Sequence, residues 1–184
     1  MSSTSIAPAR AASPPDPRAF RDALGRFATG VAIVTAAPGG RPHGLVVNSL
    51  ASVSLEPPLV SFSPARTSLT WCRMRRAGRF GVSILGARHH EFARRASVVG
   101  GDRFAGVEWE QGYGGVPLLA DALATLDCEI VAEHEAGDHW IVVGRVDDLR
   151  VAPLGAPLLF YASGFAALPV HGESDEIVST VPSR

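Results

Sequence analysis

The chain has 184 residues, of which 46% are hydrophobic, and a formal net charge of −1 at neutral pH. This length and apolar content are typical of one domain with a substantial core. The near-neutral charge argues against nucleic acid or a membrane surface as a partner. No apolar run approaches the ~20 residues that span a bilayer.

Composition divides the chain into three parts. Residues 1–17 are rich in Ser, Ala and Pro and lack the apolar stretch of a secretory signal, so we expect a disordered N-terminal lead. Residues 18–168 form the domain, and residues 169–184 form a polar tail. Cys72 and Cys128 lack Cys-x-x-Cys spacing, which argues against a zinc site or a disulfide framework and favours the cytoplasm. We expect both cysteines to be buried.

The first elements are a helix and a strand. Apolar residues recur at helical spacing over residues 18–29, and Gly30 ends this pattern. A strand is predicted over residues 31–35. Residues 38–40, Pro-Gly-Gly, are typical of the turn that closes a hairpin.

Residues 44–64 carry the most informative pattern. They predict two short strands separated by Glu56-Pro57-Pro58, with small polar residues where a core strand would carry Val or Ile. Buried polar groups need partners, and the apolar residues between them argue against a fully exposed segment. We therefore expect these strands to line a cleft that holds a polar ligand. The polar residues are Asn48, Ser49, Ser52, Ser54, Ser61 and Ser63.

A short helix follows this segment. Thr67 and Ser68 precede an apolar stretch and predict an N-cap, and Gly78 ends the helix expected over residues 69–76. His89 and His90 lack a carboxylate or thiolate at ligand spacing, so we predict no metal site there. Further along the chain we expect a strand at 79–85, a basic helix at 89–96 and a long irregular loop at 98–116.

The C-terminal half of the domain is rich in strands. Clear alternation predicts strands over residues 124–133 and 140–151, joined through residues 134–139. A last strand follows at 157–161, and residues 164–168 close the domain. Many short strands and few helices indicate a mainly β barrel or sandwich, and not a doubly wound sheet.

Nine short motifs occur in a consistent order across residues 20–168. They lie at residues 27–35, 44–49, 52–60, 78–82, 102–106, 127–128, 137–139, 144–146 and 157–161. Through them the chain resembles the flavin reductase-like proteins built on the FMN-binding split barrel. That family includes the reductase components of two-component flavin-dependent monooxygenases.

The resemblance implies both a fold and an activity. The fold is a six-stranded Greek-key split β-barrel with a few short flanking helices, assembled as a homodimer with flavin near the subunit interface. The activity is NADH- or NADPH-dependent reduction of FAD or FMN, which supplies reduced flavin to a partner monooxygenase. The chain lacks a Gly-x-Gly-x-x-Gly turn after a strand, and this agrees with a family that does not use a Rossmann unit.

The chemistry of such a reaction explains which residues are missing. A hydride passes directly between two cofactors, so the protein need not supply a nucleophile or a general acid. Its work is stacking, alignment and tuning of the flavin. No catalytic triad, carboxylate pair or metal constellation is apparent in the sequence.

The resemblance also assigns roles to individual residues. Asn48 and Ser49 would hydrogen-bond the polar edge of the isoalloxazine, and Arg66 with the Thr67 and Ser68 hydroxyls and nearby helix N–H groups would seat the phosphate. His139 would orient the nicotinamide without an obligatory acid–base role. The other residues expected at the cofactor site are Val46, Ser52, Ser63, Arg95, Arg103, Phe104, Gly137 and Asp138, the last of which would hold His139 or the local turn.

Plainer interpretations of these residues stay open. Ser68 can be an N-cap alone, Asn48 a turn residue, His139 a surface residue, and Arg95 and Arg103 solvated charges. For the whole chain, the alternatives are a flavin-binding electron-transfer protein and a non-catalytic split-barrel cofactor-binding module, such as a sensor or haem-binding protein. The motif at residues 137–139 favours a reductase, because a carrier needs no nicotinamide pocket. The sequence does not distinguish FAD from FMN or NADH from NADPH.

Overall fold

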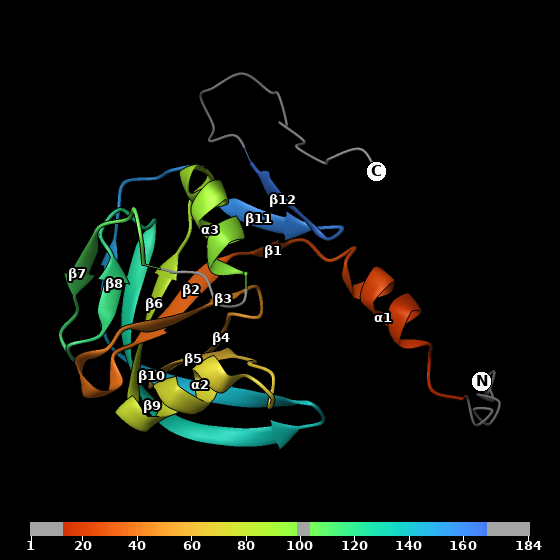
Figure 1. Ribbon diagram of the computed structural model, residues 1–184, viewed down its shortest axis with the longest axis horizontal. Helices are drawn as coiled ribbons and strands as arrows, with labels where there is room; N and C mark the ends of the chain where they lie inside the picture. The colour runs from red at the N-terminus through yellow and green to blue at the C-terminus, as the bar shows by residue number, and fades with distance from the viewer. Residues whose placement is uncertain (1–12, 99–103, 169–184) are drawn as a thin grey trace, which may run out of the picture.

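The computed structural model describes residues 13–98 and 104–168 (Figure 1). Within these ranges, seven strands form one antiparallel sheet in the order β3-β2-β6-β9-β10-β5-β4. The resemblance implies six, so the main sheet has one strand more than expected. The strands are β2 (Ala32–Ala36), β3 (His43–Val47), β4 (Ala51–Leu55), β5 (Pro58–Phe62), β6 (Arg79–Ile84), β9 (Ala124–Ala136) and β10 (His139–Val151).

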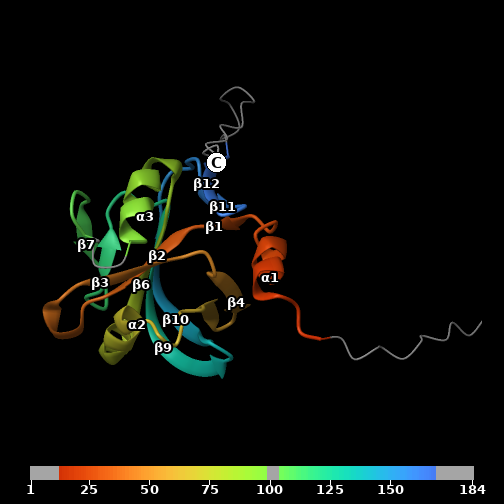
Figure 2. The same ribbon diagram turned by 45° about the vertical axis from the view of Figure 1, so that its right-hand side comes forward.

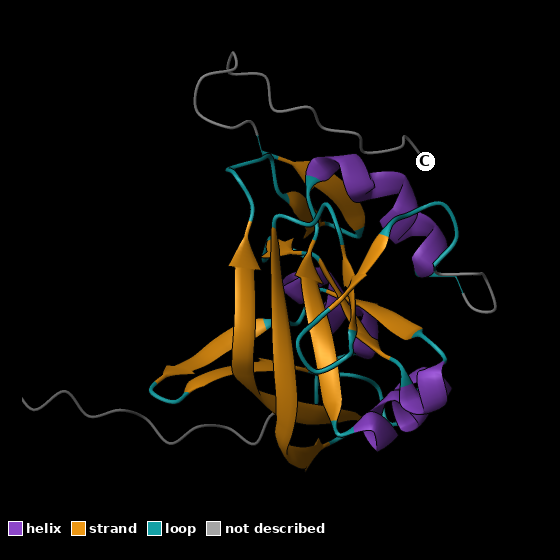
Figure 3. Cartoon of the chain, turned by 90° about the vertical axis from the view of Figure 1, so that its left-hand side faces the viewer, coloured by secondary structure: helices purple, strands orange, loops and turns teal. Residues whose placement is uncertain are grey.

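Smaller elements cover the curled sheet. Figure 3 shows helices beside the strands at two corners of the molecule, and the mainly β prediction is confirmed. The minor strands are β1 (Thr29–Gly30), β11 (Leu158–Tyr161) and β12 (Gly164–Ala167) in one sheet, and β7 (Trp109–Gln111) and β8 (Pro117–Leu119) in another. The helices are α1 (Pro17–Leu24), α2 (Leu69–Met74) and α3 (His90–Ala96), with short 3₁₀ turns η1 (Pro38–Gly40), η2 (Arg75–Ala77) and η3 (Ala87–His89).

The core lies on both faces of β2. Because side chains alternate along a strand, Val34 points into one cluster and Ile33 into the other. The first cluster centres on Phe62, whose ring centroid lies 5.1 Å from those of Trp71 and Phe80. The second cluster lies under α3 and includes Phe92. Burial on both faces explains why residues 31–34 form a continuous apolar run.

The helix predicted over residues 18–29 is shorter than expected. Asp16 caps α1, but the helix ends at Leu24, and Thr29 belongs to β1, where it pairs with Phe160. The prediction was wrong at this end because β11 is distant in sequence and recruits Thr29 into a sheet. No residue of α1 is buried, so the apolar face of this helix has no cover within the described chain. Figure 2 shows α1 standing away from the barrel.

The two strands predicted over residues 44–64 are three strands in the structure. β3 and β4 lie at opposite edges of the main sheet, and residues 48–50 pass between those edges. β3 pairs with β2, whereas β4 pairs with β5. The break falls at the polar residues because the chain changes sheet edge there. The segment that the sequence singled out thus bridges the split in the barrel.

Other boundaries also differ from expectation. The loop predicted over residues 98–116 contains β7, which pairs with β8, and this part of the prediction was wrong. The strands predicted at 124–133 and 140–151 extend to a two-residue turn, in which Gly137 has a φ of +62° that suits glycine.

The two cysteines differ in exposure. Cys128 is buried as expected, and burial raises its pKa to about 12. Cys72 is exposed, because the inner face of α2 is occupied by Trp71 and Met74.

The short helices follow the sequence signals closely. The Ser68 hydroxyl accepts a hydrogen bond from the Trp71 N–H at 3.2 Å, and Gly78, with a φ of +69°, ends the α2–η2 segment. The expected lead and tail fall mostly outside the described residues. None of the described helices has the length and apolar character needed to cross a membrane.

Candidate functional site

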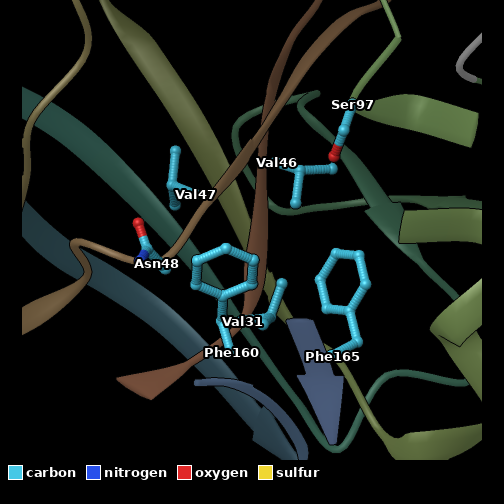
Figure 4. Close-up of a pocket in the computed structure, with 7 residues that line it drawn as sticks. All are labelled: Val31, Val46, Val47, Asn48, Ser97, Phe160 and Phe165. Carbon is cyan, nitrogen blue, oxygen red and sulfur yellow. The ribbon is translucent and has the colours of Figure 1, made fainter. Parts of the chain in front are cut away.

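A cavity of about 170 Å³ lies beside β3, between the end of α3 and the small β1-β11-β12 sheet. Figure 4 shows its mostly apolar walls, with the amide of Asn48 and the hydroxyl of Ser97 as polar groups. Such walls with a few polar groups are typical of cofactor sites. The lining residues are Val31, Val46, Val47, Asn48, Ser97, Phe160 and Phe165.

A larger groove of about 430 Å³ continues from Asn48 and Phe160 toward α1. Ser49 and Thr29 line it as well. The Thr29 Oγ1 atom is buried and has no hydrogen-bond partner within the described ranges. Because an unpaired buried hydroxyl costs about 1–3 kcal/mol, this groove suits a ligand with polar atoms. Cavity and groove together combine apolar walls with the polar groups of Asn48, Ser49 and Thr29.

Two segments that the sequence marked separately lie side by side. The Arg66 N–H donates to the Asp138 carbonyl at 2.9 Å, and the Trp140 N–H donates to the Pro64 carbonyl at 2.9 Å. Ala65 and His139 form an isolated antiparallel bridge. The loop over residues 63–68 therefore packs as a short extra strand on the tip of the β9–β10 hairpin.

The Arg66 side chain turns toward the same hairpin. Its Nη1 atom lies 3.3 Å from Glu135 Oε2 and 3.4 Å from the Gly137 carbonyl. Its Cζ atom lies 5.7 Å from the centroid of the Trp140 ring, and Arg75 lies 4.8 Å from the same ring. Trp140 therefore makes cation–π contacts with two arginines. Trp140 lies next to His139 at the tip of the β9–β10 hairpin.

A further hydrogen bond joins the loop to the barrel split. The Ser63 N–H donates to Ser49 Oγ at 3.0 Å. Ser49 therefore contacts the loop at residues 63–68, while the adjacent Asn48 lines the cavity. Thr67 is exposed on this loop. The cavity, the loop and the hairpin tip form one connected region.

His139 and Asp138 form a pair at the hairpin tip. His139 Nδ1 lies 2.7 Å from Asp138 Oδ1, and both side chains are substantially exposed. The hydrogen bond with His139, followed by its charge, lowers the pKa of the Asp138 carboxyl. The pair fixes Nδ1, so a ligand would meet the imidazole through Nε2.

Some expected residues lie apart from the cavity. Ser52 is exposed on β4 at the sheet edge. Arg95 donates to the Ala105 carbonyl at 3.0 Å and so anchors the segment after α3. The Phe104 ring lies 4.6 Å from that of Trp109 and lines a different groove. Arg103 lies outside the described residues.

Sequence reasoning missed several cavity residues and one ionic contact. Phe160 was expected in a strand, but local alternation does not show that β11 lies beside β1. Ser97 follows a short helix, and its position depends on how α3 packs. Glu135 gave no signal in the sequence, because its contact with Arg66 spans 69 positions. Among the described residues, no group of three or more His, Cys, Asp and Glu could hold a metal ion.

Comparison with known proteins agrees with this geometry. The family model for the flavin reductase like domain matches residues 24–169. The reductase subunit HsaB of a flavin-dependent monooxygenase from Rhodococcus jostii is 40% identical over 153 residues, which is 83% of this chain and 78% of that protein.

Solved structures extend the similarity to the fold. A homologue of nitrilotriacetate monooxygenase component B from Mycobacterium thermoresistibile has a TM-score of 0.81 and 35% identity, covering 89% of this chain and 92% of its own. The NADH:FAD oxidoreductase SgcE6 of Streptomyces globisporus, solved with NAD and FAD fragments, has a TM-score of 0.80 and 34% identity, covering 88% of this chain and all of its own. The expected split-barrel fold is confirmed by these neighbours, and the chain belongs to the flavin reductase-like domain family.

Proposed function

We propose that the protein is an NAD(P)H:flavin oxidoreductase, which transfers a hydride from NADH or NADPH to FAD or FMN and supplies reduced flavin to a partner monooxygenase. The observation that carries this proposal is the connection of an apolar cavity at Asn48 to a basic loop and a histidine-bearing hairpin tip. Membership of the flavin reductase-like family supports it. The relatives named as monooxygenase reductase subunits support the partner.

The cavity would hold the flavin ring. Val46 and Phe160 offer apolar surface for stacking, and the amide of Asn48 can hydrogen-bond a polar ring edge. Thr29 lines the adjoining groove, and its buried hydroxyl has no hydrogen-bond partner among the described residues, so a small side-chain rotation would let it contact a ligand atom. Bound flavin supplies the hydride acceptor, so the chain needs to align the two nucleotides and exclude water around them.

The loop at residues 63–68 would bind the flavin phosphate. Arg66 supplies a guanidinium that can form bidentate hydrogen bonds with phosphate oxygens. Its side chain is 45% exposed, so it can turn to a ligand. The exposed Thr67 hydroxyl adds a donor, and the Ser68 hydroxyl can still donate while its oxygen caps Trp71.

The hairpin tip would hold the nicotinamide. Asp138 fixes one imidazole nitrogen of His139, and this leaves Nε2 to contact the coenzyme. Trp140, held by two arginines, provides a wall next to it. His139 acts in orientation, since hydride transfer between two cofactors needs no acid–base group of the protein.

The proposal includes a homodimer in the cytoplasm. Phe20 and Leu24 on α1, and Phe27 after the helix, are 53%, 59% and 74% exposed and line one groove, and a second copy of the chain would cover them. The groove beside Asn48 borders this helix, so the partner copy would complete the flavin site. The free thiols of Cys72 and Cys128 support a reducing compartment.

Anaerobic stopped-flow absorbance in the visible flavin band tests the activity. The purified protein is mixed with FAD or FMN in excess and with NADH or NADPH. Bleaching of many flavin equivalents per protein is expected, and the four combinations identify both cofactors. Bleaching limited to one bound equivalent would indicate an electron-transfer protein. Absence of bleaching would indicate a non-catalytic module.

A further inference from the structure

Arg66 is held by a carboxylate that has no role in the activity proposed above. Glu135 Oε2 lies 3.3 Å from Arg66 Nη1, and the two side chains are 59% and 45% exposed. Glu135 pairs across the hairpin with Trp140, whose ring Arg66 covers. The carboxylate therefore lies at the point where Arg66 would meet a flavin phosphate.

The neighbouring Arg75–Glu133 ion pair is shorter and more buried than the Arg66–Glu135 contact. Glu133 lies two residues earlier on β9 and binds Arg75 at 2.6 Å. It also accepts a hydrogen bond from Trp71 Nε1 at 3.2 Å, and its side chain is 17% exposed. That pair is part of the packed structure. The Arg66–Glu135 contact is longer and more exposed, so it can exchange readily.

A flavin phosphate would replace the Glu135 carboxylate on Arg66, but the replacement lowers the affinity for the flavin. Exposed ion pairs are weak, whereas an arginine with a phosphate forms short, bidentate, charge-assisted hydrogen bonds. A phosphate on Arg66 must displace the Glu135 carboxylate and then lie near its negative charge. The two anions would lie within one Debye length, about 8 Å at physiological salt, so water and salt do not remove their repulsion.

We propose that Glu135 sets the flavin affinity by competing with the flavin phosphate for Arg66. This weakens the binding of phosphorylated flavins, so that reduced flavin leaves the reductase and reaches the monooxygenase. The inference rests on the phosphate role proposed above for Arg66. It assigns to Glu135 a positioning role, because the carboxylate acts through Arg66 and does not touch the reacting atoms.

The variant Glu135→Gln tests this competition. Dissociation constants are measured for FMN and for riboflavin, which lacks the phosphate, by flavin fluorescence. We expect FMN to bind about threefold more tightly to the variant, in line with the strength of an exposed ion pair, and riboflavin to bind unchanged. The gain should shrink at high salt. Glu135→Asp should restore most of the wild-type affinity.

Glu129→Gln is the matched control. Glu129 lies on the same strand and forms an exposed pair with Arg145, with side chains 45% and 43% exposed. This variant should leave both dissociation constants unchanged. In an Arg66→Met background, Glu135→Gln should improve FMN binding less than it does in the wild type, because no arginine is left to compete for and only direct repulsion remains. Tighter FMN binding by Glu135→Gln cannot result from damage to the fold, because such damage would weaken binding.

The other outcomes separate the inference from the proposed function. If Arg66→Met weakens FMN but not riboflavin, and Glu135→Gln leaves FMN unchanged or weaker, the competition is overturned while the phosphate site remains. If Arg66→Met affects FMN and riboflavin alike, the phosphate role of Arg66 is wrong and the inference falls with it. If the wild-type protein binds neither FMN, FAD nor riboflavin, the proposed function itself is overturned.

Discussion

The Asp127 carboxylate is buried to 1% exposure and lies 2.6 Å from Arg79 Nη2, where it joins β9 to β6. It also accepts a hydrogen bond from the Gly114 N–H at 2.6 Å. A Cβ atom on Gly114 would lie 2.0 Å from Arg79 Nε, so glycine lets this loop close over the pair. A charged pair therefore fixes the junction of two core strands and a loop.

Replacement of Asp127 should destabilise the fold. In Asp127→Asn, Arg79 keeps its contact with Asp147 at 2.8 Å but loses its buried partner. We expect the free energy of unfolding to fall by about 1.5–3 kcal/mol, because Arg79 and the Gly114 N–H lose a buried charged hydrogen-bond acceptor. Urea denaturation measures this value. The exposed Asp148→Asn should change it by less than about 0.5 kcal/mol, and equal losses in both variants would contradict the prediction.

The same cluster should make the fold sensitive to acid. Hydrogen bonds from Arg145, then Arg79, lower the pKa of the Asp147 carboxyl below its ordinary value. A carboxyl with a lowered folded-state pKa stabilises the protein above its unfolded pKa, about 4, and this stability is lost as pH falls through the folded value. Thermal unfolding from pH 6 to about pH 2 should show this loss. Asp147→Asn should flatten the curve, and an unchanged slope would show that other groups control it.

Local patterns in the sequence predict the long elements of this fold but not where they meet. Alternation identifies β9 and β10 because each is long and has one buried face. The division of residues 44–64 into three strands depends on β2 and β10, which pair with β3 and β5 and so draw the two halves of the segment to opposite parts of the sheet. Similarly, α1 ends early because Thr29 pairs with Phe160, more than 100 positions away. Such pairings have no local signal.

The candidate site shows the same limit. Asn48 and Ser49 stand out in the sequence because polar residues interrupt an apolar stretch, and they line the cavity and the adjoining groove. The cavity wall at Phe160 and the Glu135 contact of Arg66 arise from packing between distant segments.

His89 is noticeable in the sequence but has a structural role. It attracts attention beside His90, but it is buried, and its Nδ1 accepts the Gly86 N–H at 2.9 Å.

His139 should affect coenzyme binding more than flavin binding. In His139→Ala, the imidazole that Asp138 positions is removed, and no buried group is exposed, because the side chain is 46% exposed. We expect the KM for the preferred nicotinamide coenzyme to rise about tenfold, as for the loss of one good hydrogen bond, and kcat to change little. Steady-state kinetics and flavin titration measure the two effects. A kcat that falls a thousandfold with unchanged KM would indicate an acid–base role.

The apolar face of α1 should control assembly. Phe20 and Leu24 are four residues apart and lie on one face of the helix, whereas Arg18 lies on the other. In Leu24→Asp, a charge replaces an apolar contact, and sedimentation equilibrium should show the wild-type dimer become a monomer. Flavin affinity should fall as well, because Leu24 and Asn48 line the same groove. Arg18→Asp should leave the dimer intact. A wild-type monomer, or a Leu24→Asp variant that dimerises with unchanged affinity, would show that α1 is not the interface.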